Sequence, residues 1–222
     1  MDTSATVKSP NFLNPKIPAN LPVLDVPVVI ATDESLKGYG CLVPDYENFE
    51  IEIVTWPLTG RRRVDEGTGN QGGTAEGIFE FWWEGDVLWG RNNAIHDTYV
   101  LGWCCDPSEA DSQNTDSQRD QVLLWHANYH PDGGQLFYSL DGTPFMVPLA
   151  LPGDNVNPED FVSFYCDGTQ GLYIHPNIWH EGVFPIGDKG EFFDKQGKIH
   201  GRVSANFAEE FGTLLRVPLK TP

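Results

Sequence analysis

Glycine and proline interrupt this chain so often that they cut helices short along its length. The 222 residues include 23 glycines and 17 prolines, and the stretches between them are short and rich in β-branched and aromatic residues. Proline breaks a helix interior and glycine destabilises it, so this spacing favours short strands joined by turns. The sequence therefore predicts an all-β fold.

Strand-like runs follow one another between these turn residues. The expected strands are 23–32, 50–57, 77–83, 86–89, 98–104, 122–129, 135–139, 144–150, 161–166, 171–175, 181–185 and 212–219. A short helix is expected after Asn157, which precedes a proline and two acidic residues, and another within 205–211. Strands of this length and spacing are typical of a β-sandwich or barrel.

Composition divides the chain into four parts that we expect to form one compact domain. Residues 1–21 are polar and proline-containing, which predicts an extended arm, and residues 22–105 are β-rich. Residues 106–121 hold five acidic residues and one arginine, which predicts a solvated loop. We expect residues 122–222 to supply most of a barrel, to which the first half adds strands or a second sheet.

The charge of the chain limits its partners. With 32 acidic and 14 basic residues the formal net charge is −18, and no basic stripe exists that could bind nucleic acid or an anionic membrane. No run of 18 apolar residues predicts a membrane span. The start of the chain lacks a secretory pattern and the four cysteines lack a C-x-x-C spacing, so we expect reduced thiols and a cytoplasmic protein with a small-molecule partner.

Histidines cluster in the second half of the chain. In the strand-like segment WHANYH, His126, Asn128 and His130 share one face by the two-residue period. Gln135 begins the returning strand and His180 follows 45 residues later. Imidazole nitrogens and a side-chain carbonyl can hold a divalent ion with open positions, so we expect these five side chains to line one cavity. Alternatively, the histidines bond to turns and Gln135 caps a strand end.

Three segments carry a resemblance to a known family. They read HPDGGQLF at 130–137, PFMVPLA at 144–150 and DGTQGLYIHPNIWH at 167–180. In this order and spacing they resemble the ureidoglycolate lyases over residues 120–186. The same histidine and glutamine spacing is similar to the double motif of cupin barrels. Two departures are Asn128, where the lyases carry glutamate, and the segments 82–86 and 91–93, which do not resemble the N-terminal part of the lyases.

The resemblance implies a cupin-like double-stranded β-helix barrel with an N-terminal β-rich extension. It further implies a cytoplasmic homodimer that cleaves ureidoglycolate to glyoxylate and urea in purine and allantoin catabolism. Two alternatives remain open from the residues alone. One is a metal-dependent cupin oxygenase or isomerase that uses the same pocket, and the other is a cupin that binds a metabolite without turnover.

Ureidoglycolate is a carbinolamide, so its breakdown requires a base for the hydroxyl proton, an acid for the departing nitrogen and a cation near the carboxylate. The catalytic candidates are His126, His130, His175 and His180, of which His126 or His175 would carry the proton. His130, Gln135 and His180 would hold one divalent metal ion or the substrate. No organic cofactor is expected.

Other side chains are candidates for substrate binding. Arg61 and Arg63 belong to a run of three arginines that could clamp a carboxylate, and the alternative is a solvated turn in which they pair with nearby acidic residues. Asn128, Gln135 and Trp179 complete the predicted substrate-binding set.

Overall fold

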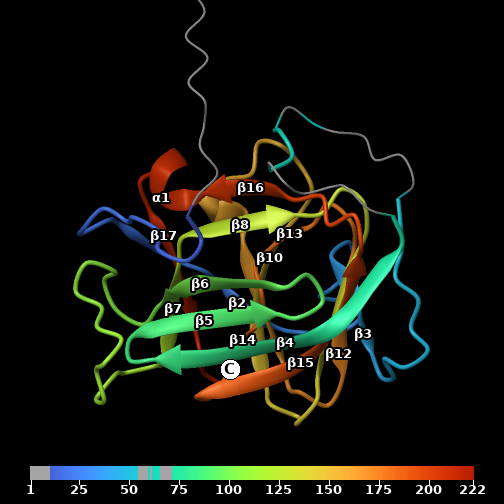
Figure 1. Cartoon of the computed structure of the whole chain (residues 1–222), viewed down its shortest axis with the longest axis horizontal. Helices are drawn as coiled ribbons and strands as arrows, with labels where there is room; N and C mark the ends of the chain where they lie inside the picture. The colour runs from blue at the N-terminus through green and yellow to red at the C-terminus, as the bar shows by residue number, and fades with distance from the viewer. Residues whose placement is uncertain (1–10, 55–59, 61, 66–71) are drawn as a thin grey trace, which may run out of the picture.

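The computed structural model describes residues 11–54, 60, 62–65 and 72–222, and the strands of this part of the chain form two sheets (Figure 1). Helical structure in the described residues consists of the 3-10 turn η1 (Pro158–Asp160) and the helix α1 (Phe207–Glu210). The prediction of an all-β fold is confirmed. No helix in the described part of the chain has the length and apolar character needed to cross a membrane.

The larger sheet mixes strands from both halves of the chain. Its ten strands are, in spatial order, β1 (Val23–Asp25), β17 (Leu214–Pro218), β7 (Gln121–Leu124), β6 (Asp97–Trp103), β5 (Val87–Asn92), β4 (Thr74–Glu84), β15 (Lys189–Gly197), β9 (Gln135–Ser139), β12 (Gly171–Ile174) and β3 (Gly40–Val43). Strands β4, β5 and β6 thus lie between β7 and β15, which come from the second half. The first half of the chain therefore adds strands to the same sheet that contains strands of the second half.

The smaller sheet carries the histidine-rich strand. Its strands are β16 (Val203–Asn206), β8 (His126–Tyr129), β13 (Trp179–His180), β10 (Phe145–Ala150), β11 (Val162–Cys166) and β2 (Val28–Ile30), with β14 (Phe184–Pro185) paired to β10. The chain leaves the larger sheet at the end of β7 and enters the smaller one at β8, with only Trp125 between them. Figure 1 shows β8 and β16 side by side, as their antiparallel register requires.

An aromatic core fills the interior of the molecule. Phe79 and Phe81 of β4 stack at 4.4 Å between ring centroids, and Phe192 of β15 meets Phe81 edge-on at 5.5 Å. Each fully buried phenylalanine contributes about 1.5–3 kcal/mol of stability. Further along β15 the same buried face carries Asp194 and Gln196, which are 0% and 1% exposed. The interior therefore changes from apolar to polar along the strand, and the polar part forms the candidate site.

Some expected strands differ in the structure. Of the predicted strand 50–57, residues 55–57 lie outside the described residues, and the rest forms a single β-bridge between Ile53 and Gly133. Strands β3, β13, β15 and β16 were not predicted. In β15, with the sequence KGEFFDKQG, charged residues and glycines make the two-residue period of burial hard to recognise in the sequence. The strand forms because it pairs with β4 on one side and β9 on the other, although its local sequence does not favour a strand.

Candidate functional site

A polar cavity lies where the inner faces of the two sheets meet. It brings together five predicted residues from both sheets, together with a sixth that the sequence did not indicate. These are His126, Asn128, His130, Gln135, His180 and His200. The expected common cavity is therefore present.

Strand alternation explains how the smaller sheet supplies its part of the lining. His126 and Asn128 share one face of β8, and His180 lies directly opposite Asn128 in the register between β8 and β13. Trp179 precedes His180 in β13 and points to the other face, where it packs edge-on against Tyr129. The structure therefore brings His180 to the cavity and leaves Trp179 out of it.

His126 forms a buried pair with Glu181, a residue that the sequence did not indicate. His126 Nε2 lies 3.0 Å from Glu181 Oε2, and the Gly182 amide donates to Glu181 Oε1 at 3.0 Å. Burial by itself would raise the pKa of Glu181, but the neighbouring His126 and the Gly182 amide outweigh it and lower that pKa. A carboxylate held against Nε2 leaves Nδ1 as the basic nitrogen, and Nδ1 has no hydrogen-bond partner among the described residues.

His130 and His200 form a second, uncharged pair. His130 Nδ1 donates to the Gly201 carbonyl at 2.9 Å, and His200 Nδ1 lies 3.1 Å from Gln196 Oε1, with 4.7 Å between the two rings. Burial lowers the pKa of His130 to about 4 and holds that of His200 well below its ordinary value. Both imidazoles are therefore neutral near pH 7. His200 was not predicted as a site residue, because no motif in its Lys/Gly-rich turn indicates a functional role.

A chain of buried side chains runs away from the cavity through Gln135. One end of the Gln135 amide lies 3.0 Å from His180 Nε2, and the other lies 2.7 Å from Asp194 Oδ1. The second oxygen of Asp194 accepts from Asn92 Nδ2 at 3.0 Å. Burial raises the pKa of Asp194 to about 7 and lowers that of His180 to about 4. Asp194 and Asn92 come from strands on either side of β4, so no local motif could have revealed them.

Two further polar atoms of the lining have no hydrogen-bond partner among the described residues. They are Asn128 Oδ1 and Gln196 Nε2. A buried polar atom without a partner costs about 1–3 kcal/mol, so such atoms indicate a site shaped for a hydrogen-bonding ligand. The guanidinium that lines the cavity belongs to Arg202, whose Nε donates to Asp65 at 2.9 Å.

Phe12 of the N-terminal arm covers the cavity. Its ring lies 5.0 Å from that of His126 and 4.3 Å from the Arg202 guanidinium, and its carbonyl accepts from the Val100 amide at 2.8 Å. The remaining cavity volume is about 20 Å³, which accommodates about one water molecule. A larger ligand must therefore displace part of the lining, to which Phe12 belongs.

Three predicted residues lie away from the cavity, and a fourth lies outside the described residues. His175 is half-buried directly after β12, where its ring centroid lies 5.3 Å from that of Tyr173. Trp179 is buried on the far face of β13, and Arg63 is exposed. Arg61 is the one outside the described residues. Arg62, the middle residue of this run, forms an ion pair with Glu210 at 2.8 Å.

The donor atoms of His130, Gln135 and His180 do not fit a divalent metal ion. Both ring nitrogens of His180 and both ends of the Gln135 amide already contact protein groups, and His130 donates from Nδ1 to Gly201 and interacts with Gln135. Within the described part of the chain, the only group of three His, Cys, Asp or Glu ligand atoms within 4.8 Å of one another comprises Asp86, Cys104 and Cys105. None of these lines the cavity.

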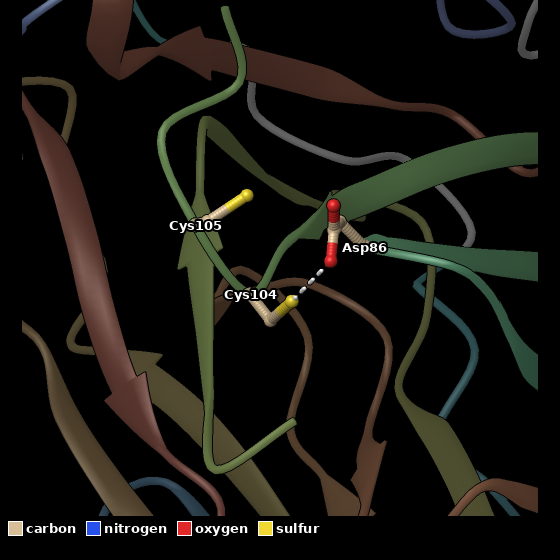
Figure 2. A group of neighbouring side chains, drawn as sticks. All are labelled: Asp86, Cys104 and Cys105. Atoms are coloured by element: carbon tan, nitrogen blue, oxygen red, sulfur yellow. Dashed lines mark hydrogen bonds between the residues drawn. The ribbon is translucent and has the colours of Figure 1, made fainter. Parts of the chain in front are cut away.

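The group of Asp86, Cys104 and Cys105 (Figure 2) lies next to the acidic loop 106–121, and Asp86 binds that loop. Cys104 Sγ donates to Asp86 Oδ1 at 3.5 Å, and the same carboxylate accepts from the Asp111 amide at 3.0 Å and from Asn114 Nδ2 at 2.9 Å. Burial and the Asp86 carboxylate raise the pKa of Cys104 to about 12, so its thiol stays protonated. The donors that surround Asp86 therefore satisfy it without an ion.

The fold and the site together define the class of the protein: an all-β, cupin-like barrel with a histidine pocket between its sheets. Within that class, residues 116–210 match the family model described as ureidoglycolate lyase. The resemblance seen in the sequence is confirmed over this segment, which runs from the end of the acidic loop to helix α1. It contains all four histidines of the cavity, together with Glu181 and Asp194.

Curated relatives agree with this match. The ureidoglycolate lyase of Azotobacter vinelandii is 35% identical over 91 residues, which cover 40% of this chain and 55% of the relative. That of Pseudomonas savastanoi pv. phaseolicola is 34% identical over 82 residues (36% and 48%), and that of Rhodobacter capsulatus is 43% identical over 63 residues (28% and 38%). The chain thus spans about half the length of the curated relatives it matches.

Proposed function

We propose that this protein is a carbon–nitrogen lyase that cleaves a small carbinolamide acid of the ureidoglycolate kind into glyoxylate and urea. One observation carries the proposal: the buried pair His126–Glu181, with a free imidazole nitrogen, lies in the cavity and within the segment that matches the lyase family. This pair supports the assignment of His126 as the base.

The unpartnered atoms of the cavity are complementary to such a substrate. Urea nitrogens donate hydrogen bonds, and Asn128 Oδ1 can accept one. A carboxylate accepts hydrogen bonds, and Gln196 Nε2 and the Arg202 guanidinium can donate them. Binding would therefore satisfy Asn128 Oδ1 and Gln196 Nε2, which have no hydrogen-bond partner among the described residues, and this favours a substrate with a donor-rich end and an anionic end.

The proposed chemistry moves one proton between two atoms bonded to the same carbon. His126 Nδ1 takes the proton of the substrate hydroxyl, the oxygen forms the carbonyl of glyoxylate, and the carbon–nitrogen bond breaks. His126 then returns that proton to the departing urea nitrogen, so no net proton, electron or water is consumed. Glu181 stabilises the imidazolium that exists between the two transfers, as a carboxylate does for a catalytic histidine elsewhere.

Several finer properties belong to the same proposal. By resemblance to the lyases, we propose that the protein acts as a homodimer in the cytoplasm and serves purine and allantoin catabolism. The steps above use His126 and Glu181 and contain no step through a metal ion. Elemental analysis of the purified protein tests the expectation of a bound divalent ion directly.

The proposal is tested with the full chain and ureidoglycolate. We expect equal amounts of glyoxylate and urea to be released under nitrogen as well as in air. His126→Ala should lower kcat by about 10²–10⁴-fold, because general acid–base catalysis contributes that much. His96→Ala is the matched control, since His96 is exposed in the turn between β5 and β6 and should keep full activity.

Other outcomes separate the alternatives. No product from ureidoglycolate, together with oxygen uptake on another acid, would contradict the lyase proposal and support a cupin oxygenase. Tight binding of ureidoglycolate without product would support a metabolite-binding protein. Equal activity of His126→Ala and wild type would refute the assigned role of His126.

A further inference from the structure

The hydrogen bonds of two buried histidines determine which of their nitrogens carry protons. His180 Nδ1 lies 2.7 Å from the Ile178 carbonyl, and His130 Nδ1 lies 2.9 Å from the Gly201 carbonyl. A carbonyl oxygen only accepts, so both Nδ1 atoms carry hydrogen. If both rings are neutral, both Nε2 atoms hold a lone pair and can only accept.

Gln135 must then present its NH₂ group to His180. The amide end facing His180 Nε2 is 3.0 Å away, and Gln135 also interacts with His130. An amide oxygen at that position would face a lone pair, which a buried site does not tolerate without cost. The structure places Gln135 Oε1 toward His180 and Nε2 toward Asp194, but oxygen and nitrogen of an amide are assigned from their hydrogen bonds, so the neutral histidines reverse this assignment.

The other end of Gln135 is then the carbonyl oxygen, 2.7 Å from Asp194 Oδ1. Two oxygens approach this closely only when one of them carries a hydrogen. Gln135 has none to give from its carbonyl, so Asp194 must donate. Its second oxygen accepts from Asn92 Nδ2, as the carbonyl oxygen of a carboxylic acid does.

The opposite arrangement holds the same number of protons. An ionised Asp194 would take the NH₂ of Gln135, whose oxygen would face His180 and require a hydrogen on Nε2 in addition to the one on Nδ1. His180 would then be an imidazolium. A neutral His180 beside an ionised Asp194 fits neither orientation of Gln135. The hydrogen-bonded group of His180, Gln135 and Asp194 therefore holds one proton more than it would with a neutral His180 and an ionised Asp194. That proton is located on Asp194 or on His180.

We propose that Asp194 is a protonated acid, and that its proton determines both the orientation of Gln135 and the protonation state of His180 in the wall of the cavity. Asp194 is 0% exposed and its described contacts include no cation, which opposes the ionised form. Burial, which raises the pKa of Asp194 to about 7 and lowers that of His180 to about 4, agrees with this arrangement. Asp194 is thus a positioning residue that acts through Gln135.

The proton also makes the cavity sensitive to pH. When it is lost, no orientation of Gln135 satisfies both neighbours, so the wall must rearrange as pH rises above about 7. The other titratable or charged groups that face this chain are His130, His200, Glu181, Tyr99 and Arg202. The histidines have lowered pKa values and Tyr99 a raised one, so these groups keep their charge in the range where Asp194 titrates.

Asp194→Asn tests the inference, because asparagine has the shape of aspartic acid and donates from one side while it accepts on the other. Infrared spectra of the wild type at pH 6 should contain the carbonyl band of a buried protonated carboxylic acid, which is lost above pH 8 and is absent from Asp194→Asn. Asp188→Asn is the matched control, since Asp188 is 84% exposed, and it should keep the band. Absence of the band from the wild type at pH 6 would overturn the inference and assign the proton to His180.

The kinetic consequence rests on the proposed function and is measured separately. Wild-type kcat/KM should fall about tenfold per pH unit above the pKa of Asp194, whereas that of Asp194→Asn should change less than about twofold over the same range. A variant that lost the band but kept the wild-type pH profile would overturn the positioning role. The infrared result needs no substrate, so it stands even if ureidoglycolate proves not to be the substrate.

Discussion

Glu181 gives His126 both a charge partner and an orientation. A strand in regular alternation would place Glu181 on the same face as Trp179, but β13 ends at His180 and the chain turns, so consecutive residues line the cavity. Glu181 is 1% exposed and has no other basic neighbour at ion-pair distance among the described residues. His126 thus has its carboxylate partner because β13 ends at His180, which lets Glu181 turn into the cavity.

Glu181→Gln isolates the charge of that partner. The amide keeps the shape of the side chain but stabilises an imidazolium poorly, so kcat should fall by about 10²–10⁴-fold while the fold is retained. The pKa of Glu181 is lowered, so its carboxylate contributes stability above its ordinary pKa of 4.5, and that contribution is lost as pH falls through the lower folded-state value. Steady-state kinetics with Glu191→Gln, an exposed control, checks the prediction. A kcat within threefold of wild type would contradict it.

At the scale of elements, the acidic loop 106–121 differs from what its composition suggests. Its many polar residues predict a solvated segment, and most of its side chains are indeed exposed. Its backbone is nevertheless held in place, because Asp86 in the turn between β4 and β5 accepts from Asp111 and Asn114, and its own amide donates to the Asp111 carbonyl at 3.0 Å. A buried carboxylate therefore helps to order a loop that has little of its own to bury.

Asp86→Ala should release this loop. Hydrogen bonds to a charged group contribute about 1.5–3 kcal/mol each in favourable cases, and we expect a net loss of about 2–3 kcal/mol in the free energy of unfolding. Urea denaturation gives the loss, and amide hydrogen exchange at Asp111 and Asn114 reports the loop itself. Asp116→Ala, an exposed residue of the same loop, should change neither measurement. Unchanged exchange in Asp86→Ala would show that other contacts order the loop.

At the scale of the molecule, the segment that matches the lyase family is not a separate structural unit. Strands β4, β5 and β6 lie outside it and are inserted between β7 and β15, which lie within it. The longest pairing in the larger sheet joins β15 to β4, and Asn92 of β5 completes the chain behind the cavity. Both halves therefore contribute to one core and to one site.

A fragment of residues 116–222 should consequently fail to fold alone. Removing β4–β6 exposes one edge of both β7 and β15 and removes Phe79 and Phe81 from the core. Near-ultraviolet circular dichroism and urea titration should show no fixed aromatic packing and no cooperative transition in the fragment, whereas the full chain shows both. A cooperative transition in the fragment would mean that the matched segment is an independent domain.

Local sequence determined the β class of this protein and one face of its site. Turn residues and the two-residue period are local properties, so they predicted short strands and placed His126 and Asn128 side by side. The spacing of the histidine cluster added Gln135 and His180, which the structure brings to the same cavity. These parts could be predicted because each depends on neighbours in sequence or on a motif with recognisable spacing.

Tertiary structure alone decided what surrounds those residues. Glu181, Gln196 and His200 reach the cavity through the end of a strand, an unpredicted strand and a turn, and Asp194 of the same unpredicted strand lies behind Gln135. The period of a strand says which residues share a face, but it does not say which strand will lie opposite. That choice is made by pairing and burial across the whole core, where hydrogen bonds between distant residues decide which groups are charged and which remain neutral.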